Sequence, residues 1–138
     1  MLSLVSGKSS VRPAAVAGVF YPQDAAELRD TVLHLLGDVV AHAAPLAQPK
    51  ALIVPHAGYA YSGMVAASAY RRLRESCAAI RNVVLIGPSH RVPMRGLAMP
   101  SVDAFETPLG EIPIDRVARQ RLRELGLAGI SDAAHAAE

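Results

Sequence analysis

The chain has 138 residues, of which 51% are hydrophobic and only 4% are aromatic, which allows one domain-sized core of aliphatic side chains. Lys and Arg number 14 and Asp and Glu number 12, so the net charge of +2 is too small for a nucleic-acid footprint or for attraction to an anionic membrane. The single cysteine, Cys77, excludes a disulfide framework and a zinc site built from several cysteines.

The chain opens with a Ser-rich, weakly apolar segment, residues 1–11, which we expect to be extended or disordered. It lacks the unbroken apolar core of about 7–15 residues that a secretory signal needs. The longest apolar runs, 51–55 and 83–86, are far too short to span a membrane. The sequence therefore predicts a cytoplasmic protein without membrane contact. Separately, we expect residues 12–21 to form an extended arm.

Three amphipathic helices follow from apolar spacing and from residues that favour a helix N-terminus. Asp24 begins a capping box and predicts a helix over about 24–41. Ser62 can cap a second helix over about 63–75. Asp115 can cap a third helix, which a glycine ends.

Two short apolar runs, 50–55 and 81–86, are typical of buried parallel strands. With the helix between them they predict one right-handed βαβ unit, and hence an α/β fold. Further short strands are expected at 96–99 and 111–113 within a loop-rich region. Because a sheet usually has about 4–6 strands, this pattern supplies only about half of an α/β domain.

Two histidines, His56 and His90, come directly after the two predicted buried strands. If those strands are parallel neighbours, both imidazoles lie at the carboxyl edge of the sheet, where open α/β sheets place ligands. Neutral imidazole is a strong metal ligand, so the pair predicts a shared metal site. In the alternative interpretation, each histidine only bonds the backbone of its own loop. Ser89 is better placed to support a neighbour than to act as a nucleophile, and Tyr59 either donates to a bound anion or packs.

Several motifs occur in a fixed order along the chain. They are Val-Phe-Tyr-Pro at 19–22, Pro-His-Ala-Gly-Tyr at 55–59, Tyr-Ser-Gly at 61–63, Gly-Pro-Ser-His at 87–90 and Glu-Thr-Pro-Leu-Gly at 106–110. Together they resemble the Memo family over residues 12–138. The closing Ala-His-Ala-Ala-Glu resembles the lead-in to that family's Glu-His-Ser-Leu-Glu motif, whose first Glu is Glu138. Since the family pattern continues for about as many residues again, we expect 12–138 to be the N-terminal part of a single Memo-like α/β domain, truncated at its C-terminus.

The resemblance implies a three-layer α/β fold with a mostly parallel sheet and flanking helices, similar to the class III extradiol (LigB-like) dioxygenases. It implies metal ligands at His56 and His90, with a third ligand, a cysteine, beyond residue 138. His135 then borders the pocket and joins Tyr59 and Ser89 as a catalytic or supporting candidate. The implied metal is Fe(II) or copper. The implied partners are an unknown small-molecule or peptide ligand and, in prokaryotes, AMMECR1-like and radical-SAM companion proteins.

Three functions stay open at this point. The first is a metal-dependent oxidoreductase similar to a dioxygenase, in which Fe(II) binds O₂ and a substrate. The second is a non-catalytic adaptor that binds a phosphopeptide-like or other anionic ligand in the same pocket. The third is a metal-carrier protein. With two ligands and half a sheet, we expect the 138 residues alone to bind metal weakly and to show little or no turnover.

Overall fold

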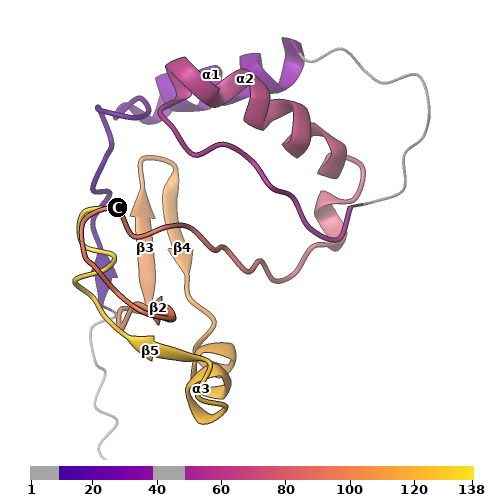
Figure 1. Ribbon diagram of the computed structural model, residues 1–138. Coiled ribbons are helices and arrows are strands. Elements are labelled where there is room, and N and C mark those ends of the chain that lie inside the picture. Colours follow the sequence, from indigo (N-terminus) through magenta and orange to yellow (C-terminus); the bar gives the residue numbers. More distant parts are fainter. Residues whose placement is uncertain (1–9, 39–48) are drawn as a thin grey trace, which may run out of the picture. The chain divides into compact units, whose positions relative to one another are not determined.

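A computed structural model describes residues 10–38 and 49–138. By its contacts the chain divides into two compact units. We call Ala17–Ile86 the helical unit, and Met1–Val16 with Gly87–Glu138 the sheet unit. The described residues contain both helices and sheets, which confirms the predicted α/β class (Figure 1). None of the described helices is long and apolar enough to cross a membrane.

The first predicted helix is confirmed as α1, Ala25–Asp38. Its start is set by Asp24, whose Oδ1 accepts hydrogen bonds from the amides of Ala26 and Glu27, both at 2.9 Å. These amides belong to the first turn, where no carbonyl of the helix can reach them, so the side chain replaces the missing acceptor. The expected end of this helix and most of the following loop fall in 39–48, outside the described residues.

Replacing Asp24 by Ala should destabilise α1 by about 1 kcal/mol, because two first-turn amides lose their acceptor. Amide hydrogen exchange of the α1 residues measures this directly. The matched control is Asp30→Ala, an exposed aspartate in the interior of the same helix, where alanine has the better helix propensity. Equal exchange rates in the two variants would mean that the cap contributes nothing.

The second predicted helix begins four residues earlier than expected and ends sooner. It is α2, Tyr59–Tyr70, with Gly58 at its N-cap, and it is followed by the 3₁₀ turns η1, Arg71–Leu73, and η2, Cys77–Ala79. Ser62 is therefore not the cap. Its hydroxyl lies within the first turn and donates to the main-chain oxygen of Ala57 at 2.8 Å, which ties the preceding loop to the helix.

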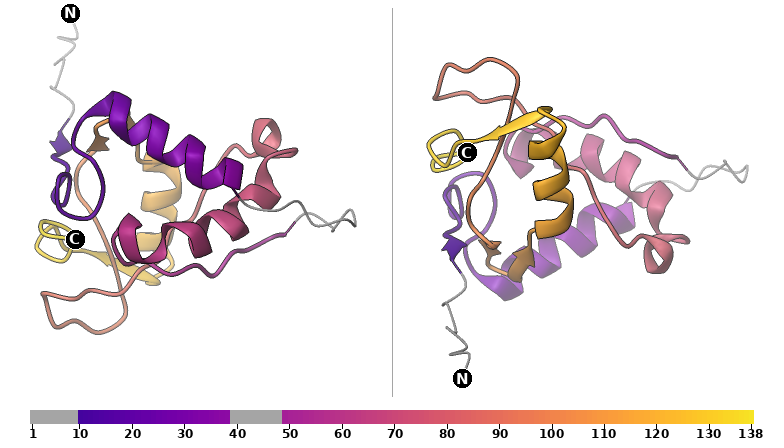
Figure 2. Two further views of the ribbon diagram at one scale, coloured as in Figure 1. Left: turned by 90° about the horizontal axis from the view of Figure 1, so that it is seen from above. Right: turned by 90° about the horizontal axis from the view of Figure 1, so that it is seen from below.

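Helices α1 and α2 lie side by side in the helical unit (Figures 1 and 2). They approach closely at Gly63, where a Cβ atom would stand 2.9 Å from a methyl carbon of Leu35. Arg71, which follows α2 directly, links the two helices. Its Nη1 donates to the main-chain oxygens of Leu36 and Gly37 in α1 at 3.2 and 3.3 Å. These carbonyls belong to the last turn of α1, where the helix itself offers no donor.

The prediction of buried strands at 50–55 and 81–86 is wrong for this structure. Both segments are described, and neither is paired as a strand. The apolar side chains of Ile53 and of residues 83–86 are exposed, the latter by 69–83%. A strand exists only where a neighbour accepts and donates its backbone hydrogen bonds, so apolar composition alone does not create one.

The sheet unit holds two small sheets. In the first, β1, Val11–Arg12, runs parallel to β3, Ala104–Thr107, which forms an antiparallel hairpin with β4, Gly110–Pro113. In the second, β2, Leu97–Met99, is parallel to β5, Ala128–Ile130. The short strands expected near 96–99 and 111–113 are thus confirmed, whereas β1, β3 and β5 were not predicted.

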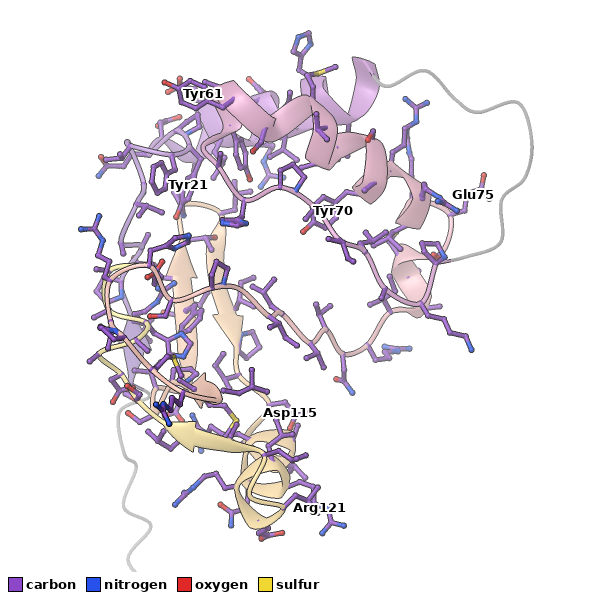
Figure 3. All side chains as sticks on the ribbon, viewed as in Figure 1. Tyr21, Tyr61, Tyr70, Glu75, Asp115 and Arg121 are labelled. Carbon is purple, nitrogen blue, oxygen red and sulfur yellow. The ribbon has the colours of Figure 1, made fainter. Side chains whose placement is uncertain are left out.

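The third predicted helix is confirmed as α3, Arg116–Glu124. Asp115 caps it by accepting from the amide of Ala118 at 2.9 Å, and Gly126 ends the turn with a φ of 67°. Arg119 joins the helix to the loop after β2, because its Nη1 donates to three main-chain oxygens at 2.6–3.1 Å. Figure 3 shows Asp115 at the start of α3 and Arg121 pointing outward.

Candidate functional site

Two of the sequence motifs, at 19–22 and 55–59, pack together in the helical unit. The amide of Tyr59 donates to the main-chain oxygen of Phe20 at 2.8 Å, and the rings of Tyr21 and Tyr59 lie 5.9 Å apart. Gly58 permits this approach, since a Cβ atom there would stand 3.2 Å from the oxygen of Phe20. The segment 19–22 therefore supports the loop that carries His56.

His56 and Tyr59 stand at the start of α2 and differ in their surroundings. His56 is exposed, two residues before the N-cap. Tyr59 is 37% exposed, and burial, followed by the neighbouring Tyr21 and Tyr70, raises the pKa of its phenol. The phenol thus stays protonated at neutral pH and can donate a hydrogen bond. Tyr61 is 89% exposed and points away from the helix pair (Figure 3).

The Gly-Pro-Ser-His loop belongs to the sheet unit and is held from two sides. The hydroxyl of Ser89 donates to the main-chain oxygen of Val92 at 2.8 Å, which fixes the turn of the loop. The amide of His90 donates to Oε1 of Glu138 at 2.6 Å, and Nδ1 of the same histidine lies 2.7 Å from Oε2. The His90 side chain nevertheless stays 53% exposed.

Glu138 is held in turn by the N-terminal strand. Its main-chain oxygen accepts from Nη1 of Arg12 in β1 at 2.8 Å. The hydrogen bonds from the ring and the amide of His90, in that order, keep the pKa of the Glu138 carboxyl below its usual range. The carboxylate is therefore ionised at neutral pH and acts only as an acceptor.

The ring and main chain of His135 are engaged by other groups of the sheet unit. Its Nε2 lies 3.2 Å from the main-chain oxygen of Ala98, which can only accept, so Nε2 carries the hydrogen. Its ring lies 6.0 Å from that of Phe105, and its main-chain oxygen accepts from Arg12 at 2.7 Å. His135 also borders a hollow of about 210 Å³ in the sheet unit. The other lining residues are Val11, Arg12, Pro13, Pro100, Val102, Asp132 and Ala136.

The predicted site residues thus fall into both units. His56 and Tyr59 lie in the helical unit, and Ser89, His90 and His135 lie in the sheet unit. Among the residues that the structure describes, no three His, Cys, Asp or Glu side chains gather closely enough to hold a metal ion. What the chain offers is two exposed imidazoles on loops that are fixed by their neighbours, and this donor type suits a first-row transition metal.

The sequence pattern did not identify Arg12 or Glu138 as residues of this region. Glu138 carried a signal, because it occupies the first position of a family motif. No sequence pattern marks Arg12, because a lone arginine in an extended arm is common. Its partners, the main-chain oxygens of His135 and Glu138, lie 123 and 126 residues away.

Comparison with known proteins gives a consistent result. The family model described as "Memo-like protein" matches residues 12–138. A MEMO1 family protein of Aquifex aeolicus is 38% identical over 91% of this chain and 44% of its own length. A MEMO1 family protein from Methanothermobacter thermautotrophicus is 40% identical over 93% of this chain and 48% of its own length. Protein MEMO1 of Homo sapiens is 34% identical over 89% of this chain and 40% of its own length. The chain therefore spans less than half the length of these curated relatives.

Proposed function

We propose, from the premise that this chain belongs to the Memo family, that it contributes His56 and His90 as ligands to a metal centre. In this proposal the metal is iron or copper, and the whole protein is an oxidoreductase similar to a dioxygenase. The corresponding fold is a three-layer, mostly parallel, LigB-like domain, to which residues 12–138 contribute the N-terminal part.

The proposal is supported by the way His90 is held, on a fixed loop with an exposed ring. A surface histidine usually moves with its loop, but this loop is fixed by the Ser89 hydroxyl and by the bond from the His90 amide to Glu138. The imidazole itself remains 53% exposed. An exposed donor on a fixed backbone is what a metal ligand requires, because the loop need not be ordered when the ion binds.

A bound iron or copper ion would supply redox chemistry and polarise a bound oxygen atom. The chain's own residues would bind the ligand and hold the loop in place. The protonated phenol of Tyr59 can donate to an anionic ligand, and Ser89 keeps the His90 loop in place. Nε2 of His135 is engaged by the main-chain oxygen of Ala98. The ring is therefore better suited to a structural contact in the sheet unit than to proton transfer.

The experiment is a titration of the 138-residue chain with Cu(II), read by paramagnetic broadening of NMR signals. We expect broadening centred on the two histidine loops. His56→Ala and His90→Ala should each weaken binding by at least about tenfold, since loss of an outer partner alone costs about 10–100-fold. His34→Ala is the matched control, an exposed histidine on α1 that should leave binding unchanged. Unchanged binding in both site variants would disprove the shared centre.

The alternatives are separated by one further measurement, made on the whole protein loaded with Fe(II). O₂ uptake with a catechol would support the oxidoreductase. Metal binding without uptake would favour the carrier or the adaptor that binds an anionic peptide. The AMMECR1-like and radical-SAM companions stay predictions for the whole protein.

A further inference from the structure

One carboxylate holds both the backbone and the ring of His90. Oε1 of Glu138 accepts from the amide of His90 at 2.6 Å and from the amide of Arg91 at 3.2 Å. Oε2 of the same carboxylate lies 2.7 Å from Nδ1 of the ring. Both oxygens are thus engaged by the same loop, and the Glu138 side chain is only 24% exposed.

This arrangement determines which ring nitrogen carries hydrogen. A glutamate carboxylate is ionised at neutral pH and can only accept, so Nδ1 of His90 must be the donor. In the neutral imidazole the lone pair then lies on Nε2. Carboxylates that accept from the second nitrogen of a ligating histidine commonly fix its tautomer and raise its basicity.

The carboxylate is itself anchored. Nη1 of Arg12 donates to the main-chain oxygens of both His135 and Glu138, at 2.7 and 2.8 Å. The guanidinium also lies over the ring of Phe105, 3.9 Å from its centroid. Strands β1 and β3 therefore fix the segment that carries Glu138, and through it the orientation of His90.

We propose that Glu138 is a positioning residue for His90: its carboxylate holds Nδ1–H, which places the lone pair on Nε2 as the nitrogen that would bind the metal. The use of that nitrogen rests on the proposed function, whereas the tautomer does not. The pair is not needed for stability, because an exposed ion pair contributes little to it.

The test measures the His90 tautomer in metal-free protein by long-range ¹H–¹⁵N NMR at mildly alkaline pH, where imidazoles are neutral. We expect Nδ1–H in the wild type and in Glu138→Gln, whose amide oxygen still accepts. In Glu138→Ala the Nε2–H form should appear. Glu111→Ala, an exposed glutamate in β4, is the matched control and should resemble the wild type. A wild-type tautomer in Glu138→Ala would overturn the proposal.

The second arm repeats the Cu(II) titration on the same variants. Glu138→Ala should weaken binding by about 10–100-fold, and Glu138→Gln by less. A changed tautomer with unchanged Cu(II) affinity would overturn the claim that the positioned nitrogen serves a metal. If the wild type binds no Cu(II), the proposed metal function fails, and the tautomer measurement still decides whether Glu138 positions His90.

Discussion

Replacing Arg12 by Ala should lower the free energy of unfolding of the sheet unit by about 2–4 kcal/mol, from lost charge-assisted hydrogen bonds and a lost cation–π contact. Its Nη1 donates to the main-chain oxygens of His135 and Glu138, and its guanidinium covers Phe105. The side chain is half-buried, so water cannot fully replace these contacts. One residue thereby joins β1, β3 and the segment at residues 135–138.

The measurement is amide hydrogen exchange of the sheet unit combined with urea unfolding followed by circular dichroism. Arg12→Lys should fall between the wild type and Arg12→Ala, because an ammonium keeps the charge but loses the planar fork. The matched control is Arg121→Ala on α3, whose 3.8 Å pair with Glu124 is exposed and should be worth less than about 1 kcal/mol. If the Arg12 and Arg121 variants are equally stable, the bridging role is refuted.

The sequence predicted the helices better than the strands, and the reason is physical. The ends of α1 and α3 are set by Asp24 and Asp115, each of which bonds amides two or three residues away. Both partners of such a contact lie within one short stretch of the chain, so a local pattern can reveal them. The runs 50–55 and 81–86 have strand-like composition, but pairing depends on a distant partner, and the described residues provide none.

For the candidate site, local motifs mark the residues but not the contacts that surround them. His56 and His90 stand out because each follows an apolar run and lies in a motif of the Memo family. The contacts around them are long-range: 48 residues separate His90 from Glu138, and 126 separate Glu138 from Arg12. His135 was predicted beside the pocket from its sequence position alone, and no local pattern shows that its ring bonds the Ala98 oxygen.

The run Val83–Ile86 should make the isolated chain self-associate. Its four apolar side chains are consecutive and 69–83% exposed. In extended backbone, successive side chains point to opposite faces, so both faces of this segment are apolar, as in a strand that is buried on both sides. Segments of this kind, with high β-propensity and no charge, associate through their unpaired backbone and side chains.

Leu85→Lys should therefore raise the concentration at which the chain associates by about ten- to a hundred-fold, since burying one leucine contributes about 1.5–3 kcal/mol. Sedimentation velocity over a concentration series measures this. The matched control is Val117→Lys, because Val117 is 81% exposed but stands alone on α3. Its replacement should change association little. Equal effects of the two lysines would assign association to net charge, and a monodisperse wild type at every concentration would contradict the role of this run.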